Sequence, residues 1–154
     1  TAESLQKCNG STAWITRMLS HTFTSMEQLL TTADQEWFSL SETDWLEAFT
    51  HHPKIGDVSS LRNKFANTAT WATNEQSAVE SANDQTLQQL AALNAAYENK
   101  FAFIFIICAT GKSAPEMLSA LNARLPNDRP TELKNAAAEQ AKITQLRLKK
   151  LQIQ

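Results

Sequence analysis

The sequence predicts an all-α protein that forms a single domain over residues 1–154. Helix-start residues recur along the chain, and apolar residues follow them at spacings of three and four, the period of an amphipathic helix. A length of 154 residues suits one domain with one hydrophobic core. We find no internal repeat, low-complexity tract or linker in the sequence that would divide it.

Three serines are placed to begin helices within the first 50 residues. Ser11 precedes a run whose apolar residues are Trp14, Ile15, Met18 and Leu19. Residues 25–28 (Ser-Met-Glu-Gln) form a capping box, in which the serine hydroxyl and the glutamine amide pair reciprocally with the N–H groups of a helix start. The helix that follows carries Leu29, Leu30 and Trp37. Residues 41–44 (Ser-Glu-Thr-Asp) predict a similar start, with three residues facing inward: Trp45, Leu46 and Phe49.

Helical patterns continue in the second half of the chain. Residues 73–76 (Thr-Asn-Glu-Gln) have the composition of a helix start, and residues 83–84 (Asn-Asp) restart a helix that carries Leu87, Leu90, Leu93 (or Asn94) and Tyr97. Residues 113–116 form another capping box, with proline in the first turn, where its missing N–H costs nothing. This helix carries Met117, Leu118, Leu121 and Leu125. Residues 126–130 predict a turn before a last long helix with Leu133, Ala136, Ala137, Ile143, Leu146 and Leu151.

The segment from Phe101 to Ala109 is the exception to this pattern. Its aromatic and β-branched residues favour a strand, but no other segment offers a strand to pair with it. We interpret it as a buried segment through the helical domain, extended at first and helical later.

Composition excludes several classes of function. The net charge is −2, and the lysines and arginines are scattered until the last turn, so we expect no nucleic-acid partner. No apolar run approaches the ~20 residues that a membrane span needs. Cys8 and Cys108 lack metal-ligand spacing, and each is expected to be a reduced thiol, so no metal site is predicted. No cleavable signal or organelle address is recognised, and we therefore expect a cytoplasmic location.

The corner at residues 51–57 (His-His-Pro-Lys-Ile-Gly-Asp) holds two of the three histidines in the chain. Pro53 disfavours helical geometry in the preceding residue, so His52 is expected at or just past a helix end. Histidine is the side chain that changes charge near neutral pH, which suits acid–base catalysis. A histidine at a helix end can also simply be stabilised by the helix dipole.

Two further residues have both a functional and a structural interpretation. Arg147 lies on or at the edge of an apolar helix face, where a buried guanidinium would need an anionic or carbonyl partner. It could equally keep its charge in solvent and offset the helix dipole. Glu75 falls in the first turn of a helix, where a carboxylate can cap the helix or form the polar floor of a pocket.

Four ordered segments together resemble a known family. They are residues 52–57 (His-Pro-Lys-Ile-Gly-Asp), 71–76 (Trp-Ala-Thr-Asn-Glu-Gln), 94–109 and 143–148 (Ile-Thr-Gln-Leu-Arg-Leu). The chain resembles 2-oxo-4-hydroxy-4-carboxy-5-ureidoimidazoline (OHCU) decarboxylase, which performs the last step from urate to (S)-allantoin. The resemblance covers most of the chain. The family often has serine where Ala72 stands and glycine where Ala102 stands.

The resemblance implies irregularly packed helices, a small-molecule substrate derived from urate and decarboxylation without a cofactor. It implies a catalytic set of His52, Glu75 and Arg147. Residues implied to line the pocket are Pro53, Ala72, Thr73, Asn74, Gln76, Phe105, Ile106, Ile107, Cys108 and Ala109. It is also compatible with a homodimer, and it implies this one step only, without the hydrolase domain fused in some relatives.

The residue types agree with that chemistry. Loss of CO2 leaves an electron pair that must be stabilised and then protonated on one face. The imidazole of His52 can move protons near neutral pH, Arg147 and Gln76 can hold ring carbonyls or a carboxylate, and Glu75 can orient His52 or bind ureido N–H groups. Two alternatives are a non-catalytic helical interaction module and a hydrolase of a related ureide.

Overall fold

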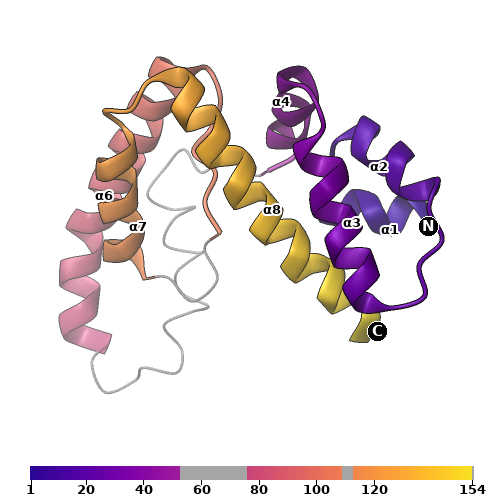
Figure 1. The fold of residues 1–154 in the computed structure, drawn as a ribbon. Helices are drawn as coiled ribbons and strands as arrows, with labels where there is room; N and C mark the ends of the chain where they lie inside the picture. The colour runs from indigo at the N-terminus through magenta and orange to yellow at the C-terminus, as the bar shows by residue number, and fades with distance from the viewer. Residues whose placement is uncertain (53–75, 109–112, 154) are drawn as a thin grey trace. The chain divides into compact units, whose positions relative to one another are not determined.

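The computed structural model describes residues 1–52, 76–108 and 113–153, and the side chains of residues 76–84 and 152–153 lie outside that description. Among the described residues there are seven helices and no strand, so the predicted all-α fold is confirmed. These residues form two compact units (Figure 1). The first comprises residues 1–52, 106–108 and 133–153, and the second comprises residues 76–105 and 113–132. The single domain expected over residues 1–154 stays a prediction.

Four short helices and most of a long one make up the first unit. They are α1 (Ala2–Cys8), α2 (Thr12–Leu19), α3 (Met26–Phe38), α4 (Glu42–Thr50) and α8 (Arg129–Ile153). The sequence patterns did not predict α1. It begins at Thr1, whose hydroxyl accepts a hydrogen bond from the N–H of Ser4, and α1 packs against α2.

The three predicted serine caps in this unit are confirmed. Ser11 and Ser25 each accept a hydrogen bond from the backbone N–H three residues ahead, and Ser41 forms a reciprocal capping box with Asp44. The detail differs at α3, where the side-chain oxygen of Gln28 accepts from the N–H of Thr24 at 2.9 Å. The long glutamine side chain therefore reaches the residue before the cap instead of the cap itself.

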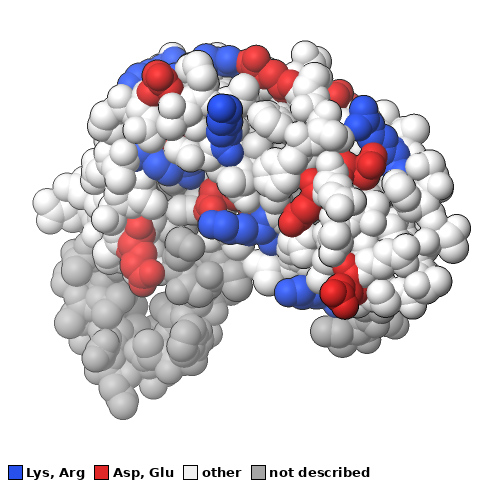
Figure 2. Space-filling view, in the orientation of Figure 1, with Lys and Arg blue, Asp and Glu red and all other residues white. Residues whose placement is uncertain are grey.

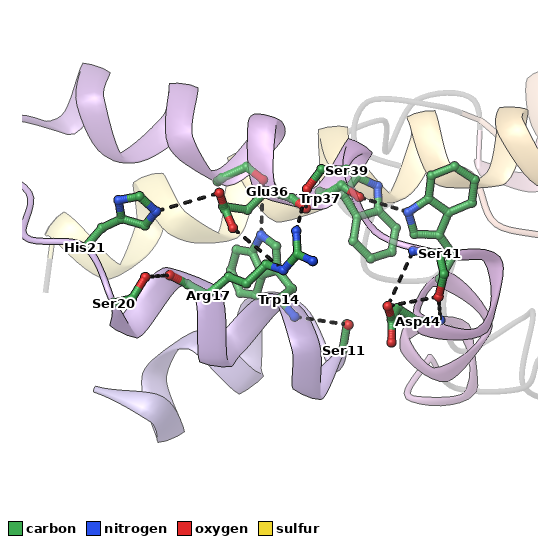
Figure 3. Close-up of polar contacts among 12 residues, drawn as sticks. Ser11, Trp14, Arg17, Ser20, His21, Glu36, Trp37, Ser39, Ser41 and Asp44 are labelled. Carbon is green, nitrogen blue, oxygen red and sulfur yellow. Dashed lines mark hydrogen bonds and ion pairs between the residues drawn. The ribbon is translucent and has the colours of Figure 1, made fainter.

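Three tryptophans join the helices of this unit through their indole N–H groups. Trp14 on α2 donates to the carbonyl of Ala33 on α3, and its indole points towards α3 in Figure 3. Trp45 on α4 donates to the carbonyl of Trp37 at 2.9 Å. Trp37 in turn donates to the carbonyl of Ala137 on α8 at 2.8 Å. Each hydrogen bond ties two helices together at one point, because the rigid ring reaches an acceptor on the neighbouring helix.

Burial in these helices follows part of the predicted pattern. Trp14, Met18, Trp37 and Phe49 are buried, whereas Trp45 and Leu46 are only half-buried. Leu19 and Phe38, the last residues of α2 and α3, are the large apolar side chains that remain about half exposed in the described part of the chain.

A carboxylate fixes α4 against the start of α2. Glu47 accepts hydrogen bonds from the backbone N–H and the hydroxyl of Thr12, both at 2.8 Å. The first N–H groups of a helix lack partners within the helix and favour a negative charge. The contact therefore holds the C-terminal half of α4, and with it His51 and His52, beside α2.

The second unit contains α6 (Gln76–Phe101), α7 (Ala114–Arg124) and the first turn of α8. Helices α6 and α7 pack side by side (Figure 1). The predicted restart at residues 83–84 was wrong, because α6 is continuous there and its sequence has no glycine or proline to end it. Leu87, Leu90 and Tyr97 are buried as their helical spacing predicted.

Two other boundaries follow the chemistry of proline. Ser113 caps α7 as expected, with a proline in its first turn. The predicted turn over residues 126–130 was too long, because α8 begins at Arg129 and Pro130 is already in its first turn. Asp128 accepts a hydrogen bond from the N–H of Thr131 at 2.9 Å. Hydrogen bonds from Thr131 lower the pKa of this exposed carboxyl group below its usual value.

The segment that follows α6 differs from the expectation in its second half. It is non-helical from Ala102 through Cys108, so the predicted return to helix by this point was wrong. Ala102 has a φ of 65°, the left-handed conformation that ends a helix. At the other end, the N–H of Cys108 donates to the Glu139 carboxylate at 3.0 Å instead of to a helical carbonyl.

Ala102→Gly should stabilise the protein. A side chain at positive φ clashes with its own backbone, and glycine avoids that clash. The expected gain in the free energy of unfolding is about 1 kcal/mol, measured by urea unfolding followed by far-UV circular dichroism. Ala102→Val should instead lose stability, since a β-branched residue tolerates this conformation worst. A loss with glycine would mean that residue 102 is helical in solution.

A buried polar cluster joins the three helices of the second unit. The Glu132 carboxylate, fully buried in α8, accepts from Tyr97 Oη at 2.6 Å, Arg124 Nε at 2.8 Å and Asn127 Nδ2 at 2.9 Å. Burial, with help from the hydrogen bond to Glu132, raises the pKa of Tyr97 far above its usual range. The phenol therefore stays a neutral donor, and the Arg124 guanidinium also lies 4.5 Å from the centre of the Phe105 ring.

None of the helices in the described part of the chain combines the length and the apolar character needed to cross a membrane. On the face drawn in Figure 2, basic and acidic side chains are interspersed over the described residues.

Candidate active site

A hollow of about 400 Å³ opens in the first unit, where three of its helices contribute side chains or helix ends. Its lining comes from α1, the link to α2, the end of α4 and the middle of α8. The lining residues are Glu3, Gln6, Lys7, Asn9, Gly10, Ala48, His51, His52, Gln140 and Arg147. It is thus a polar hollow that holds both His52 and Arg147, two residues that are far apart in the sequence.

His52 lies just past the end of α4, as the proline after it predicted. The helix ends at Thr50, His51 is its C-cap, and the N–H of His52 still donates to the carbonyl of Phe49 at 3.3 Å. The imidazole is half-buried, and its Nε2 is hydrogen-bonded to the side-chain oxygen of Gln140 on α8. The ring is therefore held between a helix end and a buried amide while it lines the hollow.

The link between α1 and α2 approaches His51 very closely at Gly10. A Cβ atom placed on Gly10 would lie 2.4 Å from Cγ and 2.5 Å from Cδ2 of His51. Only a residue without a side chain leaves room for the imidazole at this point. Gly10 thus lets the α1–α2 link form one wall of the hollow.

Gly10→Ala should destabilise the protein, because the new methyl group must push His51 and the end of α4 away. Overpacking of this kind costs roughly 1–3 kcal/mol in the free energy of unfolding. Urea unfolding of four proteins (wild type, Gly10→Ala, His51→Ala and the double variant) would measure the coupling. The double variant should regain part of the stability that the glycine variant loses, because the imidazole is gone but Cβ of residue 51, 2.7 Å from the new methyl group, remains. Additive losses would show that the two residues do not clash.

Arg147 reaches the hollow from an exposed position on α8. Its Nη1 donates to the backbone carbonyl of Lys7 at 3.4 Å. The next residue, Leu148, is buried, whereas Ile143, Leu146 and Leu151 are only half-buried, so the core face of α8 is displaced from the one expected. Of the two interpretations left open for Arg147, the structure has the exposed guanidinium and not the buried one, although it does contact a backbone carbonyl. Its charge is available at the rim of the hollow.

Charges of both signs surround the hollow. Lys7 and Arg147 contribute cations and Glu3 contributes a carboxylate. The Arg147 charge is also felt at Cys8, where burial raises the pKa of the thiol and the guanidinium opposes that rise. Cys8 is consequently a protonated, buried thiol, and the polar groups of the hollow suit a small, hydrogen-bonding guest that carries negative charge.

The other predicted site residues lie elsewhere or outside the described residues. Outside are Pro53, Ala72, Thr73, Asn74, Glu75 and Ala109, and the side chain of Gln76, the first residue of α6. Phe105 belongs to the second unit, where its ring contacts Tyr97 and Arg124. Ile106 and Cys108 are buried in the first unit, Ile107 is half-buried, and none of the three is among the residues lining the hollow. Their part in a pocket stays a prediction.

The sequence analysis did not predict that residues of α1 and Gln140 line the hollow. The signal for α1 was present, since Glu3 near its start and Lys7 near its end match the helix dipole. Gln140 and Thr144 are polar residues four apart on the buried face of α8. Polar residues in such a face indicate a buried hydrogen-bond network, but only once the face is known.

Within the described ranges, no group of three or more histidine, cysteine, aspartate or glutamate side chains is arranged to hold a metal ion.

Comparison with known sequences relates the chain to a single group of proteins. Residues 1–149 match the family model of OHCU decarboxylase. The chain is 40% identical over 147 residues to the uric acid degradation bifunctional protein TTL of Arabidopsis thaliana, which covers 94% of this chain and 45% of that protein. It is 38% identical over 61 residues to the 2-oxo-4-hydroxy-4-carboxy-5-ureidoimidazoline decarboxylase of Xenopus laevis, covering 40% of this chain and 35% of that one. The chain thus spans less than half the length of these curated relatives.

Solved structures agree with the sequence comparison. A crystal structure of OHCU decarboxylase in the presence of (S)-allantoin matches 98% of this chain and 97% of its own, with a TM-score of 0.78 and 39% identity. A crystal structure of (S)-allantoin synthase matches 96% of this chain with a TM-score of 0.70, and at 20% identity it supports the fold alone.

Proposed function

Because the chain belongs to the OHCU decarboxylase family, we propose that it is a carboxy-lyase that converts 2-oxo-4-hydroxy-4-carboxy-5-ureidoimidazoline into (S)-allantoin. This reaction would be the last step of urate degradation. The observation that carries the proposal is the match over nearly the whole of both chains to an OHCU decarboxylase crystallised with (S)-allantoin.

His52 is proposed as the acid–base residue of this reaction. The bond between the ring carbon and the carboxylate breaks, CO2 leaves, and the electron pair spreads into the adjoining C=N and carbonyl groups. The imidazole would take the proton of the substrate hydroxyl and help to return a proton to the carbon on one face. Its place on the hollow and its contact with Gln140 support this role.

Arg147 is proposed to hold the substrate carboxylate or a ring carbonyl by charge-assisted hydrogen bonds. Its exposed guanidinium on the rim of the hollow that His52 also lines supports this role. Glu75 is proposed to orient His52 or to bind the ureido N–H groups, and Gln76 to hold a ring carbonyl. The segments 72–74 and 105–109, with Pro53, would complete the pocket and exclude water.

No cofactor enters this scheme, since the substrate ring itself accepts the electron pair released with CO2. The homodimer and the cytoplasmic location that the sequence led us to expect belong to the same proposal. Light scattering of the purified protein would measure the oligomeric state.

The test uses the circular dichroism of the product. Fresh urate is treated with urate oxidase and hydroxyisourate hydrolase, and the protein is added. We expect the rapid appearance of optically active (S)-allantoin together with CO2, because the uncatalysed reaction gives the racemate. No change on adding the protein would favour a non-catalytic helical module. Product release without CO2 would favour a hydrolase of a related ureide.

A further inference from the structure

The buried polar residues of the first unit form one connected chain of hydrogen bonds. Among the described residues of this unit they are Asn9, Ser11, Gln140 and Thr144, each less than 4% exposed. The backbone N–H of Ser11 donates to Asn9 Oδ1 at 3.0 Å, and Asn9 Nδ2 donates to Thr144 Oγ1 at 3.3 Å. Gln140 Nε2 donates to the same hydroxyl at 3.1 Å, and Gln140 Oε1 meets Nε2 of His52. The chain thus ends on the imidazole that lines the hollow.

The Thr144 hydroxyl determines which way the Gln140 amide faces. Its oxygen lies 2.9 Å from the backbone carbonyl of Gln140 one helical turn earlier, and a carbonyl can only accept. The single hydroxyl proton is donated to this carbonyl or to that of Cys8, 3.4 Å away, and in either case the oxygen can only accept from Gln140. The amide NH2 faces Thr144 as a result, and the amide oxygen faces His52.

An acceptor against Nε2 selects the protonation of the ring. A neutral imidazole carries its proton on one nitrogen and a lone pair on the other. Because Gln140 Oε1 accepts, Nε2 of His52 must be the N–H donor. The lone pair of the neutral ring is then on Nδ1.

We propose that Gln140 is a positioning residue that holds the His52 imidazole in the Nε2–H form and in a fixed orientation for proton transfer. The catalytic part rests on the proposed function, whereas the hold on the ring does not. Gln140 touches the ring and acts through it.

Packing alone does not account for this arrangement. The same face of α8 is filled elsewhere by small or apolar residues, namely Ala136, Ala137, Ala141 and Leu148. An apolar side chain would serve equally well for packing at position 140, and a buried amide is favourable only when its hydrogen bonds are made. The buried hydrogen-bond chain reaches the imidazole of His52 through Gln140.

The first test uses ¹⁵N–¹H correlation spectroscopy of the histidine side chains to determine which nitrogen of the His52 ring carries the proton. The sequence has only three histidines, and a His52→Asn variant assigns the signals of residue 52. At about pH 8.5, well above the ordinary histidine pKa of about 6.5, the wild type should show a protonated Nε2 and a pyridine-type Nδ1. Gln140→Leu should give a mixture of the two neutral forms. A protonated Nδ1 in the wild type, or no change in Gln140→Leu, would overturn the proposal.

The matched control lies on the same helix. Gln145→Leu also removes an α8 glutamine, one that donates to the carbonyl of Leu30 at 2.8 Å and to Asp34 Oδ1 at 2.9 Å. Gln145 is not among the residues of the hollow. This variant should leave the His52 spectrum unchanged. A change in both variants would show a general loss of structure instead of a specific hold on the ring.

The second test is kinetic. Gln140→Leu should lower kcat about a hundredfold with little change in KM, since the imidazole is misoriented while the cations that bind the substrate remain. Gln140→Glu keeps an acceptor and should restore most of kcat. Its carboxylate also favours the protonated ring, so the acid limb of the pH–rate profile should move up by about one pH unit.

The outcomes of these tests distinguish a failure of the proposed function from a failure of the proposed role of Gln140. If the wild type makes no (S)-allantoin but the spectra behave as expected, the proposed function fails and the hold on His52 stands. If the wild type is active and neither the spectrum nor kcat responds to Gln140→Leu, this inference fails and the proposed function stands. A Gln140→Leu variant that does not fold leaves the wild-type spectrum and Gln140→Glu to decide.

Discussion

His52→Ala should abolish the formation of optically active allantoin and leave the helical fold intact. General acid–base catalysis contributes about 10²–10⁴-fold to the rate, and His52 lines the hollow with its imidazole held by Gln140. The stability cost should be small, because the residue is half-buried and lies past the end of α4. The initial rate is measured by circular dichroism of the product, and the fold by far-UV circular dichroism and thermal unfolding.

Two further variants make this result specific. His21→Ala removes a histidine whose Nε2 lies 3.7 Å from the Glu36 carboxylate, outside the hollow, and should retain the wild-type rate (Figure 3). His52→Asn keeps a side-chain donor for Gln140 but cannot exchange protons near neutral pH, and should be as inactive as alanine. If His52→Ala still makes optically active allantoin at near the wild-type rate, His52 is not the acid–base residue.

Local signals in the sequence were enough to predict most helix starts. The caps at Ser11, Ser25, Ser41 and Ser113 depend on hydrogen bonds that span three residues, so no tertiary information is needed to find them. The same local reading failed at residues 83–84, since asparagine and aspartate can begin a helix but do not oblige one to begin.

The conformation of the segment after α6 could not be predicted from local sequence signals. Residues 101–109 have strand-like composition, and the non-helical course of residues 102–108 depends on two tertiary or conformational features. One is the positive φ of Ala102, a conformation that the presence of an alanine in a sequence does not predict. The other is the contact between the N–H of Cys108 and Glu139, which are 31 residues apart.

The candidate site divides in the same way. His52 was found because a proline after a histidine predicts a helix end, and Arg147 because of its place in a family-like segment. The contribution of α1 and Gln140 depends on how α1, α4 and α8 meet, which no spacing in the sequence encodes. Gln140 in particular became a candidate only when Thr144 fixed the direction of its amide.

Glu132→Ala should cause the largest loss of stability of any single change considered. Its fully buried carboxylate receives three hydrogen bonds and faces Arg124, whose side chain is only 13% exposed. Removing one partner of a buried pair leaves an uncompensated charge and costs about 3–5 kcal/mol in the free energy of unfolding. Urea unfolding followed by far-UV circular dichroism measures that loss.

Two milder substitutions should show how much of this loss of stability comes from a single hydrogen bond and how much an exposed ion pair contributes by comparison. Tyr97→Phe removes one of the three donors and should cost about 1 kcal/mol, because Arg124 and Asn127 still satisfy the carboxylate. Lys142→Ala breaks another ion pair of α8, to Glu139, but that lysine is 65% exposed, so the change should stay within about 0.5 kcal/mol. An equal, small loss in Glu132→Ala and Lys142→Ala would mean that water reaches Glu132 and that the cluster does not hold α6, α7 and the start of α8 together.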